Sequence, residues 1–279
     1  MSNNPLVSIV VTTKNEQSHI GACLKSISQQ SYRKLEVIVV DNNSSDGTKQ
    51  ISRKYTKYVY NFGPERSAQR NFGARKAKGE YLLFIDADMI LTKNVVMECA
   101  KKMEISQVGA VVIPEKSVGE GYWTKVKAFE RSLYEGDSSI EAARFFKKEV
   151  FWEFGGYDKK ITGPEDWDLP QRIKKKYRIG RVKSFISHDE GRVSLLTLMK
   201  KKYYYGLKVP DYLSNDHPVK LTAQQVIYLL RPAFYRNWKL LTRNPKLTFG
   251  MMIMLLGEQA AGFIGFIKGI LTRKRGNRK

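Results

Sequence analysis

Short apolar runs alternate with amphipathic segments through the first half of the chain. The runs are rich in Val, Ile, Leu and Phe, which is typical of strands buried on both faces of a parallel sheet. The segments between them repeat apolar residues every three or four positions, as helices do. This alternation predicts an α/β fold built on a doubly wound, mostly parallel sheet. We expect strands at 7–11, 35–40, 59–60, 81–85 and 108–113, helices at 18–30, 66–78, 94–103 and 123–134, and no clear element at 140–147.

The pattern changes beyond residue 192. Segments 195–207 and 224–241 mix basic and aromatic residues with aliphatic ones, as helices at a membrane interface do. Residues 247–270 are predominantly apolar and long enough to cross a bilayer, but Glu258 would be costly at its centre unless protein buried it. We favour a helix or a broken hairpin that lies in the membrane interface. A spanning helix and an oligomer contact are the alternatives.

Charge is distributed as unevenly as the apolar residues. Residues 1–170 carry 25 Lys and Arg against 22 Asp and Glu, a net charge of +3, whereas residues 171–279 carry 24 against 5, a net charge of +19. The second part therefore requires an anionic partner, either nucleic acid or an acidic membrane surface. Its basic residues interleave with long aliphatic runs and match no known nucleic-acid-binding module, which favours the membrane.

The cysteines and the N-terminal residues both indicate a cytosolic protein. Cys23 and Cys99 lie in helix-like segments without the spacing of metal ligands, so we expect buried free thiols. The apolar stretch at 6–11 is too short for a signal peptide and begins a strand. We therefore place the chain at the cytoplasmic face of the cell membrane, as a peripheral or monotopic protein.

Three acidic clusters stand out in the first 170 residues. Asp41 ends one apolar run, and the pair Asp86 and Asp88 follows another. In open α/β sheets, ligands bind outside the carboxyl ends of the strands, so these carboxylates mark a ligand site. The third cluster, Glu165 and Asp166, follows a Gly-Pro turn.

Each cluster suits a definite chemistry and also has a structural explanation. Asp86 and Asp88 could turn toward one divalent cation, because oxygen ligands select Mg²⁺ or Mn²⁺, or they could be simple turn residues. His188 could complete the metal shell or hold the leaving phosphate, or it could be a structural histidine. Asp166 could take a proton from an attacking hydroxyl, or cap the helix that begins beside it. Arg70 could contact a diphosphate or pair with a surface acid.

Together, and in this order, these segments resemble family 2 glycosyltransferases with the GT-A fold. The resemblance covers residues 5–190. Four segments carry it. Residues 7–16 resemble the opening strand and nucleotide-binding loop of the family, and residues 37–48 resemble its second strand and turn. Residues 70–88 resemble the helix and strand that lead into Asp86-Ala87-Asp88, and residues 163–172 resemble the acceptor-side Glu-Asp motif.

The resemblance implies an inverting transfer of a sugar from a nucleotide-diphosphate sugar to a lipid-linked saccharide or another glycan at the membrane. UDP is the expected nucleotide and GDP the alternative. Asp166 would be the catalytic base with Glu165 beside it, and Trp167 would face the acceptor, with core packing as its alternative. A Mn²⁺ or Mg²⁺ ion would be held by Asp88, Asp86 and His188. The nucleotide sugar would be bound by Thr12, Thr13, Asn15, Glu16, Asp41 at the base, Asn43, Arg70, Asp86 and Ala87.

The resemblance also implies a catalytic domain over residues 1–192, with a nucleotide-sugar half at about 1–113 and an acceptor half at about 114–192. A membrane-associating region would follow at 193–279. Three other functions are open, namely a synthase that charges polyprenyl phosphate directly, a nucleic-acid-binding protein and an inactive scaffold with the same fold. The complete acidic set argues against the scaffold. The chain could also form a homo-oligomer.

Overall fold

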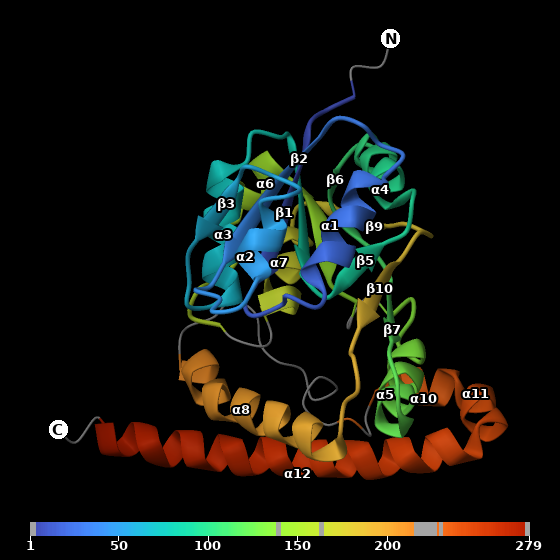
Figure 1. Cartoon of the computed structure of the whole chain (residues 1–279). Coiled ribbons are helices and arrows are strands. Elements are labelled where there is room, and N and C mark those ends of the chain that lie inside the picture. Colours follow the sequence, from blue (N-terminus) through green and yellow to red (C-terminus); the bar gives the residue numbers. More distant parts are fainter. Residues whose placement is uncertain (1–3, 138–140, 162–164, 215–227, 229–230, 277–279) are drawn as a thin grey trace. The chain divides into compact units, whose positions relative to one another are not determined.

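The chain folds into two compact units, which Figure 1 shows as ribbons. The computed structural model describes residues 4–137, 141–161, 165–214, 228 and 231–276. We call the first unit the sheet unit and the second the helical unit. The sheet unit comprises residues 1–116, 141–159 and 164–189, and the helical unit comprises 117–140, 160–163 and 190–279. The functional division expected at residues 113 and 192 stays a prediction.

A seven-stranded sheet forms the centre of the sheet unit, in the order β3-β2-β1-β4-β8-β6-β9. The first four strands in this order pair in parallel, and β9 is parallel to β6. Strand β8 runs antiparallel between β4 and β6. The predicted mostly parallel sheet is therefore confirmed. The strands are β1 (Val7–Thr13), β2 (Leu35–Asp41), β3 (Val59–Asn61), β4 (Tyr81–Asp86), β6 (Val108–Val112), β8 (Ala143–Lys147) and β9 (Arg178–Arg181).

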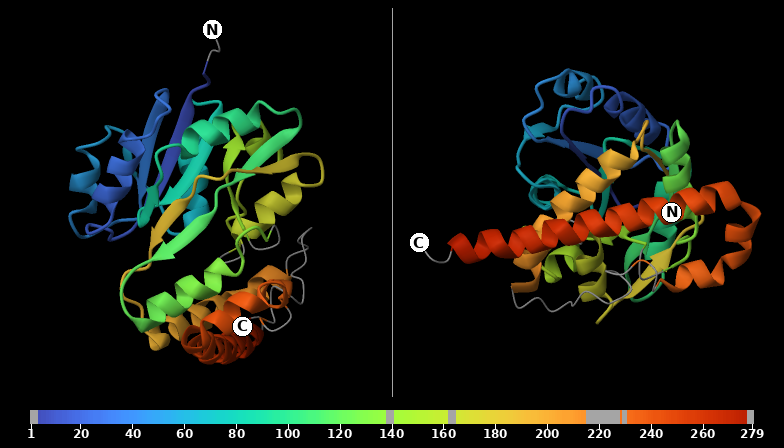
Figure 2. Two further views of the ribbon diagram at one scale, coloured as in Figure 1. Left: turned by 90° about the vertical axis from the view of Figure 1, so that its right-hand side faces the viewer. Right: turned by 90° about the horizontal axis from the view of Figure 1, so that it is seen from below.

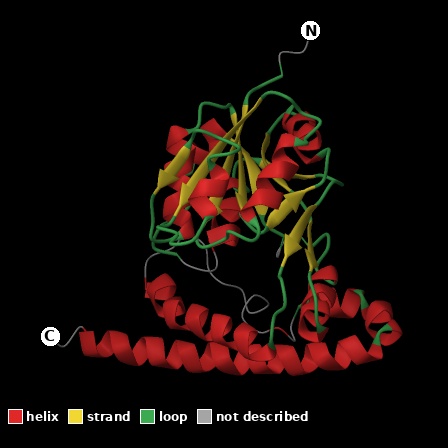
Figure 3. Ribbon diagram, in the orientation of Figure 1, coloured by secondary structure: helices red, strands yellow, loops and turns green. Residues whose placement is uncertain are grey.

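Helices cover both faces of this sheet, as Figure 3 shows. On one face, Ile9 and Val11 of β1 share a core with α1, α2 and α4. On the other face, Val10 shares a core with α3, α6 and α7. Both faces of β1 are thus buried, as its continuous apolar run predicts. The helices are α1 (Ile20–Ser28), α2 (Thr48–Ser52), α3 (Arg66–Lys76), α4 (Val95–Met103), α6 (Lys148–Glu153) and α7 (Glu165–Ile173).

Parallel pairing brings three polar strand ends to one edge of the sheet. In the register of β1, Thr12 lies opposite Asp86 of β4, and Thr13 lies opposite Asp41 of β2. A second sheet, in the order β5-β10-β7, begins just after Asp86. Its strand β10 runs antiparallel to β5, which places His188 opposite Met89, next to Asp88. The strands are β5 (Met89–Leu91), β7 (Glu115–Val118) and β10 (Ile186–Asp189).

The helical unit has a core of its own, made by buried apolar residues of four of its described helices, and Leu240 and Leu241 of the fifth helix pack against it. Its last helix, α12, packs along α8, and Figures 1 and 2 show the two side by side. They run in the same direction, since Gly257 of α12 lies near Met199 of α8 and Gly269 lies near Leu207. The helices are α5 (Tyr122–Ser132), α8 (Leu195–Ser214), α10 (Pro232–Arg236), α11 (Trp238–Arg243) and α12 (Pro245–Gly276).

Two sequence predictions for this unit are wrong. The broken hairpin considered for 247–270 is one continuous helix, because its glycines lie against neighbouring groups and do not break it. The single helix expected at 224–241 lies partly outside the described residues, and its described part divides into α10 and α11 at Asn237. The side chain of Asn237 donates to the carbonyls of Leu133 (2.9 Å) and Ala233 (3.0 Å), which fixes the break.

Candidate active site

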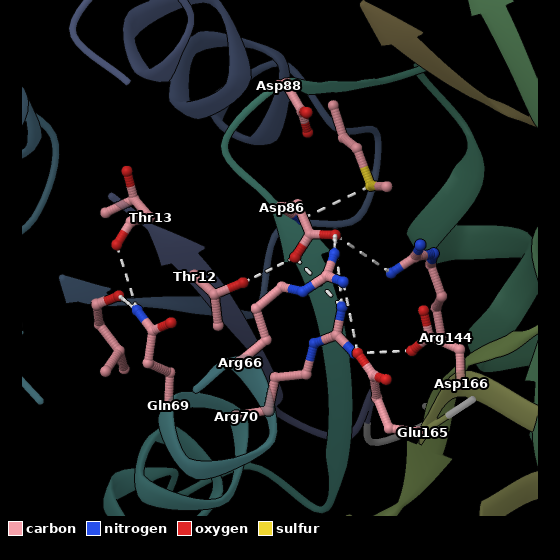
Figure 4. A network of polar contacts seen from close by, with 12 residues as sticks. Thr12, Thr13, Arg66, Gln69, Arg70, Asp86, Asp88, Arg144, Glu165 and Asp166 are labelled. Atoms are coloured by element: carbon pink, nitrogen blue, oxygen red, sulfur yellow. Dashed lines mark hydrogen bonds and ion pairs between the residues drawn. The ribbon is translucent and has the colours of Figure 1, made fainter. Parts of the chain in front are cut away.

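Asp86 lies at the centre of a polar network where β1 and β4 end (Figure 4). Its Oδ1 accepts a hydrogen bond from Thr12 Oγ1 at 2.7 Å. Three guanidinium groups surround the same carboxylate, from Arg70 at 3.1 Å, Arg66 at 3.8 Å and Arg144 at 3.9 Å. Burial alone would raise the pKa of Asp86, but the charges of Arg70, Arg144 and Arg66 outweigh burial and hold that pKa far below its usual range.

Arg70 joins Asp86 to the third acidic cluster of the sequence. Its Nη1 donates to Asp166 Oδ1 at 2.6 Å, while its Nη2 contacts Asp86. The Arg70 side chain is completely buried, and its guanidinium lies over the ring of Tyr157 with 5.1 Å to the centroid. The two alternatives set out for Arg70 were a diphosphate and a surface acid. Its partners in the structure are two acids of the site itself.

Glu165 and Asp166 occupy the first turn of α7 and differ in exposure. Asp166 keeps 23% of its side chain exposed, whereas Glu165 keeps 2%. Glu165 Oε1 lies 3.5 Å from Arg66 Nη2. Burial and the neighbouring charge of Asp166 raise the pKa of Glu165. Asp166 is therefore the carboxylate of this pair that a substrate can reach. The Gly-Pro turn before it lies outside the described residues.

Hydrogen bonds hold α3 and α7 in place around this network. Asn71 of α3 donates from Nδ2 to the carbonyl of Tyr157 at 2.7 Å and accepts from the Tyr157 amide at 3.0 Å. Arg172 of α7 donates to Asp168 at 2.9 Å and to the carbonyl of Gly156 at 2.8 Å. These contacts fix the helices that carry Arg66, Arg70 and Asp166.

Asp88 lies on the other side of Asp86 from Arg66 and Arg70 (Figure 4). His188 Nε2 is 3.1 Å from Asp88 Oδ2, and His188 Nδ1 is 3.6 Å from Glu115 Oε2. The other oxygen of Asp88, Oδ1, is buried and has no hydrogen-bond partner among the described residues. The structure thus brings Asp88 and His188 together, as the metal prediction requires. Within the described ranges, no group of three or more His, Cys, Asp or Glu side chains has the placement of a metal site.

The loops after β1 and β2 are tied together by the polar residues expected at the nucleotide. The Asn15 amide donates to Ser44 Oγ at 2.8 Å, and the Glu16 amide donates to Thr48 Oγ1 at 2.8 Å. Asp41 is completely buried and accepts from the Ser44 amide at 2.8 Å, so its side chain shapes the turn. The structure shows this turn contact of Asp41, and the expected contact with the nucleotide base stays a prediction.

The remaining expected residues lie around the same edge. Thr13 is buried, and its carbonyl accepts from Gln69 Nε2 at 3.1 Å. The amide of Ala87 donates to the carbonyl of Thr12 at 3.2 Å. Asn43 is exposed, and its amide donates to Asn61 Oδ1 at 2.9 Å. Trp167 is half-buried on α7.

Three charged residues of the network escaped the sequence analysis. Arg66 precedes Arg70 by one helical turn, so the two face the same side of α3, and this spacing was the available signal. Arg144 is the second residue of the five-residue strand β8, which gave no clear pattern. It is 95% buried and forms an ion pair with Glu115, which reaches the site from β7. Only the antiparallel insertion of β8 beside β4 brings Arg144 to Asp86.

Comparison with known proteins gives three related findings. The sequence model of the family described as Glycosyl transferase family 2 matches residues 8–161. The chain is 29% identical over 166 residues to the GalNAc(5)-diNAcBac-PP-undecaprenol beta-1,3-glucosyltransferase of Campylobacter jejuni. It is 30% identical over 216 residues to the poly(ribitol-phosphate) beta-N-acetylglucosaminyltransferase TarS of Staphylococcus aureus. These alignments cover 56% and 72% of this chain but 52% and 35% of the two relatives, so the chain spans about half of their length or less.

Solved structures agree with the fold. The mannosyltransferase PcManGT from Pyrobaculum calidifontis, in complex with GDP-Man and Mn²⁺, superposes with a TM-score of 0.66 at 20% identity, over 96% of this chain and 88% of that one. TarS in complex with UDP-GlcNAc superposes with a TM-score of 0.53 at 18% identity, over 97% and 92%. The predicted GT-A-like fold is confirmed by these likenesses.

Proposed function

The chain belongs to glycosyltransferase family 2, and from this membership we propose that it moves a sugar from a nucleoside diphosphate sugar to a hydroxyl group of a lipid-linked saccharide or another glycan. The anomeric carbon is inverted in a single displacement. The main support for this proposal is one observation: the buried guanidinium of Arg70 joins Asp86 to Asp166. A donor site at Asp86 and an acceptor base at Asp166 then lie on either side of one rigid cation.

Asp166 acts as the general base in this proposal. Its position on α7, its partial exposure and its anchored Oδ1 suit a carboxylate that accepts the proton of the attacking hydroxyl. Glu165 is too deeply buried for that role, and its ion pair with Arg66 suits it to shape the site. The hydroxyl oxygen, once deprotonated, attacks the anomeric carbon while the nucleoside diphosphate leaves.

Asp88 and His188 fit a divalent cation such as Mn²⁺ or Mg²⁺. The buried Oδ1 of Asp88 lacks a hydrogen-bond partner among the described residues, and a carboxylate oxygen with an imidazole nitrogen is a donor set that Mn²⁺ accepts. Asp86 is already engaged by three arginines and one hydroxyl, so we propose that it supports the ion from outside its ligand shell. Such an ion, when bound, neutralises negative charge on substrate phosphates.

Arg66 is the cation of the network that a diphosphate can reach. Its side chain is 42% exposed, whereas those of Arg70 and Arg144 are buried. A guanidinium suits phosphate oxygens because it offers several N–H donors in one plane. We therefore assign to Arg66 the contact with the leaving diphosphate that the sequence analysis assigned to Arg70.

The acceptor is proposed to be presented at the cytoplasmic face of the cell membrane. Support comes from the C. jejuni relative, whose name specifies an undecaprenol-linked acceptor, and from the C-terminal helix. By length and composition alone, Pro245–Thr272 is the one helix, within the described residues, that could cross a membrane. The basic composition of residues 171–279 adds attraction to anionic headgroups.

A nucleotide-binding panel tests the donor site. UDP, GDP, CDP and dTDP are each added to the purified chain with Mn²⁺, with Mg²⁺ or with EDTA, and the unfolding temperature is measured. A ligand at 100 times its dissociation constant stabilises the folded state by about 2.7 kcal/mol, which is readily seen. We expect one nucleotide, with UDP as the first candidate, to raise the unfolding temperature only when the metal is present. The absence of any shift would contradict the proposal.

An Asp166→Asn variant tests the general base. General-base catalysis contributes roughly 10²–10⁴-fold, so turnover should fall by that factor while the nucleotide-dependent shift stays the same. Glu104→Gln, an exposed acid of the sheet unit, is the matched control. Full turnover in Asp166→Asn would exclude this role. Transfer to bare polyprenyl phosphate, tested in the same assay, would replace the proposed acceptor with the lipid phosphate.

A further inference from the structure

We propose that α12 lies in the plane of an anionic membrane surface, with one face inserted among the lipids and the opposite face packed on the helical unit. This inference deepens the membrane association included in the proposed function. It concerns binding alone, so its failure would leave the proposed catalysis untouched.

An apolar stripe follows the exposed face of α12. Its side chains recur every three or four residues, which is the repeat of one helix face. The stripe extends over roughly 33 Å at 1.5 Å per residue, and Ala260 fills the gap at its middle without adding polarity. Soluble monomers rarely expose apolar surface of this extent. Its members are Phe249, Met252, Ile253, Leu256, Phe263, Ile264, Ile267 and Leu271, exposed by 39% to 66%.

The opposite face of α12 is committed to protein contacts. Met251, Met254 and Leu255 belong to the core of the helical unit. Glu258, the acid that would be costly in lipid, is only 2% exposed and lies 3.4 Å from Lys127 of α5. A second ammonium, that of Lys202 on α8, lies 3.7 Å from the same carboxylate. The charge near the middle of α12 is therefore neutralised inside the protein, away from the stripe.

This arrangement favours an in-plane helix over a spanning one. The length of α12 permits both orientations, so the helices packed against α12 distinguish between them. If α12 spanned the bilayer, α5 and α8 would enter with it, together with Lys127, Lys202 and the exposed Lys200 and Lys201. Lysines at the bilayer centre are strongly unfavourable. An in-plane helix buries only the stripe and leaves these lysines on the side of the headgroups and water.

The net positive charge of this region indicates that the apolar stripe binds lipid and not a second copy of the chain. Residues 190–279 carry 17 Lys and Arg against 4 Asp and Glu, a net charge of +13. Two copies that met through this region would repel each other, whereas anionic headgroups attract it. Lys246 and Lys268 are exposed near the two ends of the stripe. Exposed Tyr235 and Trp238 stand beside basic residues in α10 and α11, a mixture that is typical of membrane interfaces.

Flotation of the full chain with vesicles tests the surface. We expect the protein to float with vesicles of phosphatidylcholine and phosphatidylglycerol, and to float at least tenfold less with phosphatidylcholine alone. Leu256→Glu and Phe263→Glu should each reduce the bound fraction at least tenfold. Ile105→Glu, at an exposed apolar position of the sheet unit, is the control and should bind as the parent does. Equal binding of all variants, or no binding by the parent, would overturn the proposal.

Depth measurements test the orientation. Cys23 and Cys99 are buried, so a cysteine introduced at 249, 256 or 271 can be labelled selectively with a fluorophore. Quenching by lipids that carry spin labels at different depths should place all three positions at the same shallow depth. A position 256 much deeper than 249 and 271 would establish a spanning helix instead. A dimer in the absence of lipid, abolished by Leu256→Glu, would assign the stripe to a second copy.

Nucleotide binding separates this inference from the proposed function. The metal-dependent shift with a nucleoside diphosphate should be the same in Leu256→Glu as in the parent, because the substitution lies in the helical unit. Loss of vesicle binding with the shift retained is the expected result. If the parent showed the shift but did not bind vesicles, the membrane inference alone would fail.

Discussion

Arg70 donates to Asp166 across 2.6 Å from a position with no solvent exposure. The same guanidinium reaches Asp86 at 3.1 Å, so one buried cation is shared by two carboxylates that lie 80 residues apart in the sequence. A buried arginine with two acidic partners holds both in fixed directions, because its donors lie in one plane. The separation of Asp86 and Asp166, which are the donor and acceptor sides in the proposed function, is thereby fixed by a single residue of α3.

Removal of this guanidinium should cost both stability and activity. Arg70→Met leaves two carboxylates without their shared partner, and breaking a buried ion pair in this way costs about 3–5 kcal/mol. We expect the lower end, about 3 kcal/mol, because Arg66 and Arg144 still face Asp86. Urea unfolding measures the loss. Arg75→Met, an exposed arginine over Trp152 on the same helix, should cost less than about 1 kcal/mol. Equal costs would refute the bridging role.

Substitution of Arg66 should weaken the binding of the nucleoside diphosphate. We expect Arg66→Gln to weaken the binding of a nucleoside diphosphate with metal by about 10- to 100-fold, because a hydrogen bond to a charged group contributes about 1.5–3 kcal/mol. Calorimetric titration with UDP and with UMP provides the check, since the loss should be smaller for the monophosphate. Arg53→Gln, an exposed arginine at the end of α2, is the control. The same loss for both nucleotides would remove Arg66 from the diphosphate.

The fold was predictable because its central strands are buried on both faces. The apolar run of β1 contributes Ile9 to one core and Val10 to the other, and such a run is typical of an inner strand in a covered sheet. The carboxylates at strand ends followed from the same reasoning, since parallel strands end at one edge. The strand ends therefore indicated Asp41 and Asp86, which the register of β1 places at one edge of the sheet. Asp166 was indicated by its own acidic cluster and by the family resemblance, and Arg70 joins it to Asp86 in the structure.

What escaped prediction depends on contacts between elements far apart in the chain. Strand β8 has five residues with Arg144 at its second position, so neither a strand period nor an apolar run stood out. Its place between β4 and β6 depends on tertiary contacts, which no local sequence pattern reveals. The partners of Arg70 were hidden for the same reason, because an arginine on a helix gives no sign of which acids will surround it.

The stability of the helical unit should depend on pH through Glu130. Burial alone would raise its pKa, but Lys127 at 2.7 Å and a hydrogen bond from Tyr134 outweigh burial and lower the pKa to about 2 from 4.5. Because the pKa is lower in the folded state, the stabilisation is complete above about pH 4.5 and is lost as the pH falls toward 2. A shift of this size corresponds to about 3 kcal/mol.

Unfolding of the full chain by urea between pH 7 and pH 3 tests this dependence. The parent should lose more stability than Glu130→Gln as the pH falls, because the variant lacks the carboxylate that becomes protonated. Glu120→Gln, an exposed acid of the same unit, should follow the parent. Parallel curves for the parent and Glu130→Gln would show that Glu130 is not a source of acid sensitivity.

Two glycines of α12, three residues apart, should respond in opposite ways to alanine. A Cβ atom at Gly265 would lie 2.2 Å from the carbonyl oxygen of Tyr203, a backbone atom of α8 that cannot move without shifting its helix. The nearest atom to a Cβ at Gly262 would be the carbonyl oxygen of Lys202 at 3.8 Å, which is an ordinary contact. Gly265→Ala should therefore destabilise the chain by about 1–3 kcal/mol, as overpacking does.

Gly262→Ala should be neutral or stabilising by up to about 1 kcal/mol, because alanine has the higher helix propensity and meets no obstacle. Thermal unfolding of the two variants beside the parent decides between these expectations. Stability changes of opposite sign in the two variants would show that α8 and α12 are held together by close backbone contact at Gly265. That contact brings the backbones of α8 and α12 together on the face of α12 opposite the stripe. Destabilisation by both alanines alike would mean that α8 and α12 approach closely along the whole glycine series, and stabilisation by both would mean that they are not in backbone contact.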